Sequence, residues 1–352
     1  MSEIKHERPG VYSVYDASAV VSAGRAAKRI GVVARAGRGI VCSPVALTGY
    51  AAGVTIFGET AGGMSDLLRV LFQNGASVVV GVRVANDAAL SDYQAAFAVL
   101  EKQDVQIVVC DSADQSVHQA LRASLESASA ARRERIAVVG GYGESAAELV
   151  AHAATLNSER MVLVGPDALD PSGANVGGAL AAAALAGVIA AGTDPAVPLN
   201  GAEIRGIGGL SEDYSDNDID LLVRGGVTPL ESVAGVVSPV RGITTRTTTG
   251  GAADTTWREL TTILIADDII PTLRSALRSK FARAKNTARS RGAIRSQVIV
   301  ELEKKVAAEI IDGYGDVSVT ASEEDPAVCL VEFSFAVAHG LNQIYLTVHI
   351  TV

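Results

Sequence analysis

Residues 136–164, IAVVGGYGESAAELVAHAATLNSERMVLV, decide the fold class of this chain because they contain a complete strand–helix–strand unit. Two short apolar runs, Ile136–Val139 and Met161–Val164, predict buried strands. The segment between them, Ser145–Leu156, has the spacing of an amphipathic helix. A helical connection of this kind joins parallel strands, so the unit predicts a parallel α/β layer.

The same alternation extends toward the N-terminus. We expect a helix at Leu90–Lys102, a strand at Val105–Cys110 and a helix at Gln115–Arg132. Residues 29–84 instead show short apolar runs broken by glycines, which predict a mainly β segment. The runs are Ile30–Val33, Ile40–Cys42, Val54–Phe57 and Val78–Val84. One helix is expected there, near Ser65–Phe72.

Beyond the strand–helix–strand unit, Val176–Ala191 is rich in alanine and uninterrupted by charge. It is shorter than the roughly 20 residues that a membrane-spanning helix needs, so a buried, closely packed helix is expected. Ser215 is predicted to cap a short helix through Val223, which explains the neighbouring acidic residues without a metal. A tract rich in threonine, Thr244–Thr249, then precedes the C-terminal module.

The C-terminal module is expected to mix helices and strands. Pro271 suits the first turn of a helix, because proline is tolerated there. The predicted helices are Thr256–Ala266, Ile269–Ala288 and Ile294–Ile310, and the predicted strands are Val317–Ala321 and Val328–Val337.

Both ends of the chain are predicted to be extended arms. The last nine residues alternate strictly, with Ile344, Leu346, Val348, Ile350 and Val352 on one face. Near the other end, Val11, Tyr12, Val14 and Tyr15 form a short β-prone run. A two-faced terminal strand needs a partner for its apolar face and its hydrogen bonds, and that partner is either the chain's own sheet or another copy of the protein.

Composition limits the function. The chain has 352 residues, with 30 Lys and Arg against 39 Asp and Glu, for a formal charge of -9. This balance argues against a general nucleic-acid binder. Cys42, Cys110 and Cys329 are scattered singly, without a metal-ligand or disulfide spacing. The charged N-terminus lacks an apolar signal segment, so synthesis in the cytoplasm is expected.

One pattern suggests nucleotide chemistry. Gly141, Gly143 and Ala146 match a GxGxxA dinucleotide fingerprint between a strand and a helix, and Asp167 follows the next strand. Glu144 argues against this interpretation, because it would stand where a pyrophosphate binds. A cytoplasmic nucleotide-binding α/β enzyme therefore stays open as the alternative function. The histidines and cysteines predict no catalytic or metal site, and we expect no cofactor.

The strongest non-enzymatic signal is a basic strip. Residues 271–300 contain eight Lys and Arg and no acidic residue. Such a strip is either a solvated helix surface or a docking surface for an acidic partner. The residues expected to dock are Arg274, Arg278, Lys280, Arg283, Lys285 and Arg289, with Arg291 and Arg295 beside them.

Several short motifs, in this order, resemble the sheath proteins of contractile phage tails and related injection particles. They are Pro9-Gly10-Val11-Tyr12, Gly31-Val32-Val33-Ala34, Pro44-Val45 with Thr48, Leu71-Phe72-Gln73-Asn74-Gly75-Ala76 before Val82-Arg83-Val84, Asp194-Pro195, Gly225-Gly226-Val227, and Arg241-Gly242-Ile243 before the threonine tract. The resemblance covers nearly the whole chain. None of these motifs is catalytic, so the resemblance implies a structural protein and not an enzyme.

The resemblance implies a subunit of a contractile sheath, assembled as stacked hexameric rings around an inner tube, that contracts to drive the tube through the target envelope. Its implied partners are other copies of itself, the tail tube protein, and baseplate and tail terminator proteins, with no nucleic acid and no membrane insertion. The implied location is the virion tail or a tail-like particle, assembled in the host cytoplasm. The terminal arms would add strands to neighbouring subunits, and the basic strip would face the tube. Because the chain is short for the family, outer decorative domains are expected to be absent.

The expected fold class is a multidomain α/β and α+β chain. It comprises a β-rich N-terminal segment, a middle parallel α/β domain, and a C-terminal α+β domain with extended terminal β-arms. The expected divisions are an arm at 1–20, a β-rich module at 21–88, an outward-facing α/β domain at 89–240, a tube-facing domain at 241–338 and an arm at 339–352.

Overall fold

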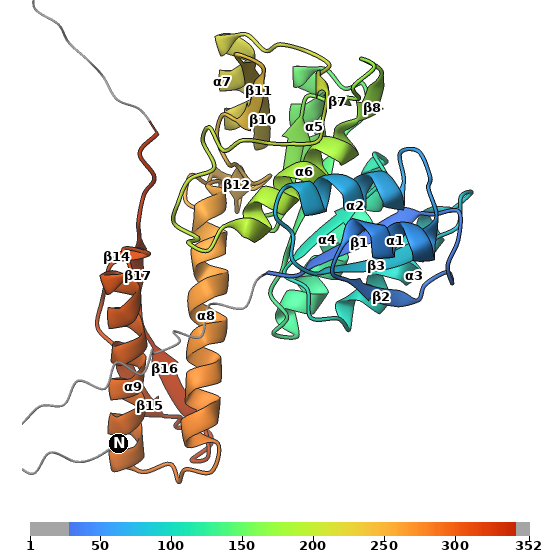
Figure 1. The fold of residues 1–352 in the computed structure, drawn as a ribbon. Coiled ribbons are helices and arrows are strands. Elements are labelled where there is room, and N and C mark those ends of the chain that lie inside the picture. Colours follow the sequence, from blue (N-terminus) through green and yellow to red (C-terminus); the bar gives the residue numbers. More distant parts are fainter. Residues whose placement is uncertain (1–27, 343–352) are drawn as a thin grey trace, which may run out of the picture.

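The computed structural model describes residues 28–342. Its main body is an eight-stranded sheet covered by helices on both faces, and a long helical hairpin projects from that body (Figure 1). The sheet strands are β1 (Ile30–Arg35), β2 (Pro44–Leu47), β3 (Val79–Val84), β4 (Ile107–Cys110), β5 (Ile136–Gly140), β6 (Met161–Gly165), β10 (Val227–Val233) and β11 (Val236–Pro239).

The strand order is β11-β10-β6-β5-β4-β1-β3-β2. From β10 to β3 all neighbouring strands are parallel, while the edge strands β2 and β11 are antiparallel to their neighbours. The predicted parallel α/β layer is therefore confirmed. The chain passes from β1 to β3 on one side and then to β4 on the other, which places a topological switch point beside β1.

Seven helices of the described chain precede the hairpin and pack around this sheet. They are α1 (Tyr50–Phe57), α2 (Met64–Gln73), α3 (Leu90–Glu101), α4 (Gln115–Ala130), α5 (Ala146–Leu156), α6 (Gly178–Ala191) and α7 (Asp216–Arg224). Alternate residues of β1 enter different cores: Ile30 and Val32 pack with α2 and α6, whereas Val33 packs with α3. This two-sided burial explains why the parallel strands are apolar throughout.

The alanine-rich segment forms the buried helix that was expected. Nearly every side chain of α6 is buried, and the helix contacts α2 and strands β4 to β6. Small residues allow this close approach: a Cβ added at Gly187 would lie 2.7 Å from the Asn74 Cβ and 2.9 Å from the Leu71 carbonyl oxygen.

In the N-terminal segment, the helix near Ser65 and the strands at β1 and β3 are confirmed, but the β prediction for Val54–Phe57 is wrong. These residues belong to α1, where the buried Gly53 packs closely against Leu68 of α2. A short apolar run is compatible with either a buried strand or a buried helix, so its period does not distinguish them. Strands β1 to β3 join the same sheet as β4 to β6, so the sheet runs across the expected division at residue 88.

The C-terminal module consists of the hairpin α8 (Leu260–Phe281) and α9 (Ala288–Ala307) with two small antiparallel sheets. Its core is separate from the two cores of the body and includes Ile265, Ile269, Val298 and Leu302. The small sheets pair β14 (Ile311–Tyr314) with β17 (Phe335–Val337) and β15 (Ser318–Ala321) with β16 (Cys329–Glu332). The remaining short strands are β7 (Ala168–Leu169), β8 (Asn175–Gly177), β9 (Gly209–Leu210), β12 (Thr248–Thr249) and β13 (Ala252–Ala253).

Three expectations for this module are wrong. Pro271 lies inside the continuous helix α8 instead of starting a helix. Buried side chains on both sides of it, from Ile263 to Leu273, hold the helix together, although proline removes one backbone hydrogen bond. Helix α9 begins at residue 288, because Thr287 caps it by accepting from the Ser290 amide. The predicted strand Val328–Val337 is split into two strands with different partners.

The fold class is confirmed as multidomain α/β and α+β. The arms predicted at residues 11–15 and 344–352 lie outside the described residues, and the domain divisions remain predictions.

Candidate functional site

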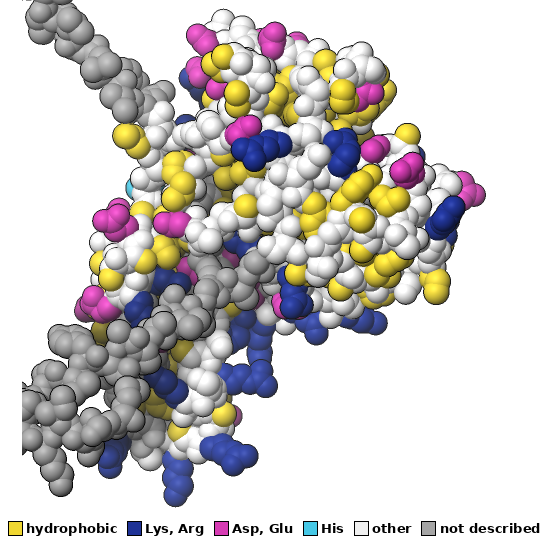
Figure 2. Space-filling model, viewed as in Figure 1, with side chains coloured by type: hydrophobic (Ala, Val, Ile, Leu, Met, Phe, Trp, Pro, Cys, Tyr) yellow, Lys and Arg dark blue, Asp and Glu magenta, His cyan; other side chains and the backbone are white. Residues whose placement is uncertain are grey.

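The basic strip covers the two facing ends of α8 and α9 and the turn between them. Figure 1 shows this end of the hairpin far from the large sheet, and Figure 2 shows Lys and Arg side chains gathered over it. The turn is fastened to the small sheet, since Asn286 donates to the carbonyl oxygens of Pro326 at 2.8 Å and Val328 at 3.1 Å. These hydrogen bonds therefore hold the turn in place against the small sheet.

Four of the basic residues already have side-chain partners within the chain. Lys280 donates to Gln297 at 2.5 Å across the hairpin, and Arg295 donates to the Val317 carbonyl oxygen at 2.8 Å. Arg291 donates to Asn286 at 3.0 Å. Arg274 lies nearer the body, where it forms a bidentate ion pair with Glu134.

The other four basic residues define the hairpin tip: Arg278, Arg283, Lys285 and Arg289. All four are exposed, and none of their side chains has a hydrogen-bond or ion-pair partner among residues 28–342. Arg289 lies in the first turn of α9, where a cation is unfavourable because the helix dipole is positive at that end. This charge therefore does not stabilise the helix. Because its four basic side chains are exposed and unpaired in the described chain, the hairpin tip is the part of the strip that is available to a partner.

The base of the hairpin is held to the body by charged pairs. Arg160, just before β6, donates to both carboxylate oxygens of Asp267 on α8, at 2.8 and 3.1 Å. Arg274 binds both oxygens of Glu134, before β5, at 2.6 and 3.1 Å. Burial opposes ionisation of Glu134, but the hydrogen bonds and charge of Arg274 outweigh it and lower the pKa of that carboxyl. Sequence reasoning missed this junction, because its partners are more than a hundred residues apart.

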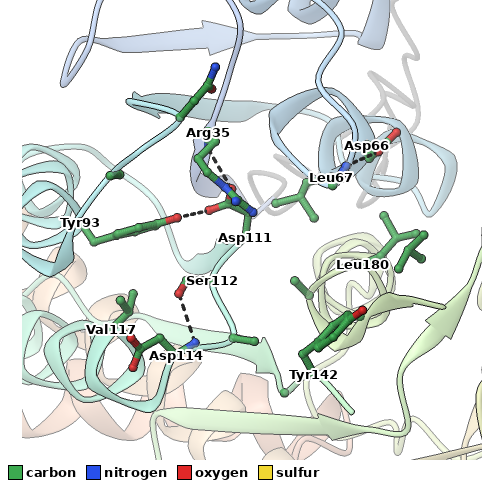
Figure 3. Close-up of a pocket in the computed structure, with 18 of the residues that line it drawn as sticks. Arg35, Asp66, Leu67, Tyr93, Asp111, Ser112, Asp114, Val117, Tyr142 and Leu180 are labelled. Atoms are coloured by element: carbon green, nitrogen blue, oxygen red, sulfur yellow. Dashed lines mark hydrogen bonds and ion pairs between the residues drawn. The ribbon is translucent and has the colours of Figure 1, made fainter.

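A crevice of about 610 Å³ lies at the carboxyl ends of β1, β3, β4 and β5, where open α/β sheets bind their ligands. Figure 3 shows Arg35 and Tyr93 pointing toward Asp111, whose carboxylate is fully buried. Asp111 accepts from the Arg35 Nε at 2.7 Å, the Arg35 amide at 2.9 Å and the Tyr93 hydroxyl at 2.7 Å. Burial, together with this carboxylate, raises the pKa of Tyr93. The network is satisfied within the chain.

The crevice is unsuited to a dinucleotide. Arg35 is the one basic residue among its lining, which carries the carboxylates of Asp66, Asp87, Asp111 and Asp114. A pyrophosphate would be repelled by these charges.

The GxGxxA turn is occupied by its own side chains. The Gly143 amide donates to Asp167 at 2.7 Å, and Ser145 with Glu148 caps the start of α5. Glu144 turns inward to His152 at 3.0 Å. A dinucleotide would need the Gly143 amide and the start of α5 for its pyrophosphate, and both already have partners within the chain. The geometry therefore does not support the nucleotide alternative.

Other reactive groups are placed as structural residues. Burial raises the pKa of the Cys110 thiol to about 12, which keeps it protonated and unreactive. His118 and His152 are fully buried against each other. Within residues 28–342 no cluster of His, Cys, Asp and Glu has the arrangement of a metal site, and none of the helices there has the length and apolarity to span a bilayer.

Sequence comparisons identify relatives over most of the chain. The model of the phage tail sheath protein central domain matches residues 87–245, and that of the phage tail sheath C-terminal domain matches residues 252–351. The tail sheath protein of Bacillus phage SP01 is 29% identical over 278 residues, which are 76% of this chain and 47% of that protein. The chain thus spans about half the length of this curated relative.

Solved structures share the fold at low sequence identity. The contracted helical sheath of the anti-feeding prophage superimposes with a TM-score of 0.73 at 15% identity, covering 98% of this chain and 99% of that one. The sheath tail protein from Desulfitobacterium hafniense gives a TM-score of 0.72 at 12% identity, covering 93% of this chain and 100% of that one. With both sheath domains matched in order along the sequence, the chain belongs to the contractile phage tail sheath family, which is structural and not enzymatic.

Proposed function

We propose that this protein is the subunit of a contractile sheath that polymerises as stacked hexameric rings around an inner tube. On a trigger from the baseplate, the extended lattice contracts to a wider, shorter one and drives the tube through the target envelope. No nucleotide takes part, since the free energy comes from better packing of subunits in the contracted lattice. The observation that carries this proposal is the fold shared with the contracted anti-feeding prophage sheath over 98% of the chain.

The hairpin tip is the proposed contact with the tube. The side chains of Arg278, Arg283, Lys285 and Arg289 are exposed without partners in the described chain, and the hairpin carries them away from the body. Arg274 and Lys280, which the sequence also assigned to docking, already bind Glu134 and Gln297. An exposed ion pair contributes roughly 0 to 1 kcal/mol, so one tip binds weakly while many tips along a tube bind firmly.

The terminal arms are proposed to link subunits. Val11–Tyr15 and Ile344–Val352 have the pattern of strands that pair with a neighbour, and the family match reaches residue 351. Each arm hydrogen bond contributes only about 0.5 to 1.5 kcal/mol net, and ordering an arm costs a similar amount per residue. The arms would therefore act as tethers between subunits more than as the source of the contraction energy.

The other proposed partners follow from this role. They are the baseplate and tail terminator proteins at the two ends of the sheath, and the proposed location is the virion tail or a tail-like particle assembled in the host cytoplasm. The net negative charge of the chain favours neither binding to nucleic acid nor insertion into a membrane.

Electron microscopy of the purified full chain, alone and mixed with its candidate tube protein, tests the proposal. Hollow tubes or stacked rings with sixfold symmetry are expected, and their diameter reports whether the lattice is extended or contracted. Uniform small particles under all assembly conditions would contradict the sheath role.

A charge-reversal variant tests the tube contact separately. Arg278→Glu, Lys285→Glu and Arg289→Glu together should abolish co-sedimentation with tubes while tube-free polymerisation continues. The matched control reverses the exposed Arg38, Lys102 and Arg132 on the body, with the same change in net charge. Equal loss of tube binding in both variants, or in neither, would overturn the assignment of the hairpin tip.

A further inference from the structure

Two histidines from neighbouring helices meet in the core. His118 on α4 and His152 on α5 are both 0% exposed, and their rings stack with centroids 5.0 Å apart. The His118 Nδ1 lies 3.0 Å from the His152 Nε2. Each outer nitrogen also has a partner: the His118 Nε2 lies 2.8 Å from the Ser112 carbonyl oxygen, and the His152 Nδ1 lies 3.0 Å from a Glu144 carboxylate oxygen.

The two ends of this chain of groups determine how many protons it holds. The Ser112 carbonyl can only accept, so the His118 Nε2 must carry a hydrogen. A neutral His118 is then bare at Nδ1 and accepts from the His152 Nε2. The His152 Nδ1 faces the Glu144 carboxylate, which also only accepts when it is ionised. Every contact is satisfied only if one further proton lies between His152 and Glu144.

The surroundings place that proton at the Glu144 end. Burial and the neighbouring His152 lower the pKa of His118 to about 4, so His118 remains neutral. The charged groups near the pair are Glu144 and, at the cap of α4, Asp114.

The elements packed around the pair offer few other charges. Strands β5 and β6, beneath the two helices, carry only apolar residues and glycine. Helix α3 carries Asp92 and Glu101, and Glu101 accepts from Ser124 farther along α4. Two other elements pack on α5: α7, which carries Asp216, Asp218, Asp220 and Arg224, and β10, which carries Glu231. Arg224 is the one cation on these elements, and its side chain pairs with Asp220 on the exposed face of α7 instead of with the chain of groups.

We propose that the Ser112–His118–His152–Glu144 chain stores one buried proton, held as a His152 imidazolium against the Glu144 carboxylate. The stored proton joins the turn after β5, which carries Glu144, to the loop after β4, which carries Ser112. Both segments line the crevice at the carboxyl edge of the sheet, through Gly141 and Tyr142 on one side and Ser112 and Asp114 on the other. The chain is thus a pH-sensitive brace within the α/β body, independent of the sheath role.

The proton count predicts the direction of the pH effect. Unfolded histidines titrate near 6.5, so the unfolded pair holds about two protons at pH 5, one at pH 6.5 and none at pH 8. In the proposal, the folded pair keeps the one proton that its hydrogen-bond contacts require. Its contribution to stability is therefore greatest near pH 6.5, and above that pH the unfolding equilibrium constant rises by up to about tenfold per pH unit.

Nitrogen-15 NMR of the labelled full chain at pH 7.5, in solution or as a solid polymer, tests the proposal. Both nitrogens of His152 should show imidazolium shifts, and His118 should show the neutral form protonated at Nε2. Neutral shifts for both rings would overturn the proposal, and this spectrum decides without any variant.

Glu144→Gln offers a second test. The amide can donate to the His152 Nδ1, which satisfies the whole chain with neutral rings, so the variant should fold and lose the imidazolium signal. In urea unfolding between pH 7 and 8, the unfolding constant of the wild type should rise up to about tenfold more than that of Glu144→Gln. The control Glu126→Gln removes an exposed carboxylate paired with Arg122 and should behave as the wild type. Equal pH dependence in all three proteins would contradict the stored proton.

Discussion

Arg160 and Asp267 show how single charged residues hold the hairpin to the sheet. Their side chains are only 14% and 17% exposed, and two hydrogen bonds join them. Burial raises the pKa of Asp267 even beside the guanidinium of Arg160. The carboxylate of Asp267 therefore depends on Arg160 to stay charged. Removing one member leaves the other charge buried and uncompensated.

We expect Arg160→Met to lower the free energy of unfolding by about 3 kcal/mol, because Asp267 loses its partner. Urea unfolding at pH 7 measures the change. Arg224→Met is the matched control, since Arg224 pairs with Asp220 on an exposed face of α7 and should change stability by less than about 0.5 kcal/mol. Equal effects in the two variants would mean that the junction contributes no more than a surface pair.

At the scale of elements, α6 determines how tightly the body packs. The helix lies on the sheet and against α2, with glycine or alanine at most contact positions. At Gly140, an added Cβ would clash with the backbone of Gly178. The absence of side chains at these positions is therefore a packing requirement.

Gly187→Ala should destabilise the protein by about 1 to 3 kcal/mol, because its Cβ would overlap Asn74 and the Leu71 carbonyl oxygen. Thermal unfolding measures this cost. The same substitution at Gly292 in α9 is the control: nothing lies within 4 Å of the new Cβ, and alanine should stabilise the helix by about 0.5 to 1 kcal/mol. Stabilisation at both positions would show that α6 has room for side chains.

At the scale of the whole molecule, the projecting hairpin separates the hairpin tip from the body. The body and the C-terminal module have separate cores within residues 28–342. Each part therefore keeps its own core when the contacts that we propose between subunits change.

Deleting residues 344–352 should yield a folded, monomeric subunit that fails to polymerise, because the three described cores stay intact while the proposed linking strand is lost. Circular dichroism and analytical ultracentrifugation measure folding and assembly. Sheaths of normal length from the truncated chain would contradict the linking role of this arm.

Loading of the full chain onto tubes should weaken as salt rises from 0.05 to 0.5 M, because exposed charges are screened within a few ångströms at high ionic strength. Co-sedimentation across a salt series measures the effect. Tube binding that does not change with salt would indicate an apolar contact away from the hairpin tip.

Much of the fold was predictable from local patterns. The helices at 90–101 and 115–130 and the strand between them follow their hydrophobic patterns, and Ser215 caps α7 through Asp218 as expected. Prediction failed where one sequence feature is compatible with two structures. Val54–Phe57 is apolar enough for a buried strand but forms a helix. Pro271 suits the start of a helix but lies inside α8, where buried neighbours support it.

The sequence by itself determined the parallel α/β layer, the acidic balance, the basic strip and the family, because periodicity, charge and short motifs are local properties of the chain. Only the tertiary structure decided which basic residues are available. Arg274 is occupied by Glu134 from a distant segment, while Arg278 and Lys285 are exposed at the hairpin tip. It also decided that His118 meets His152. These pairings depend on strand order and helix packing, which bring together residues that carry no sign of each other along the sequence.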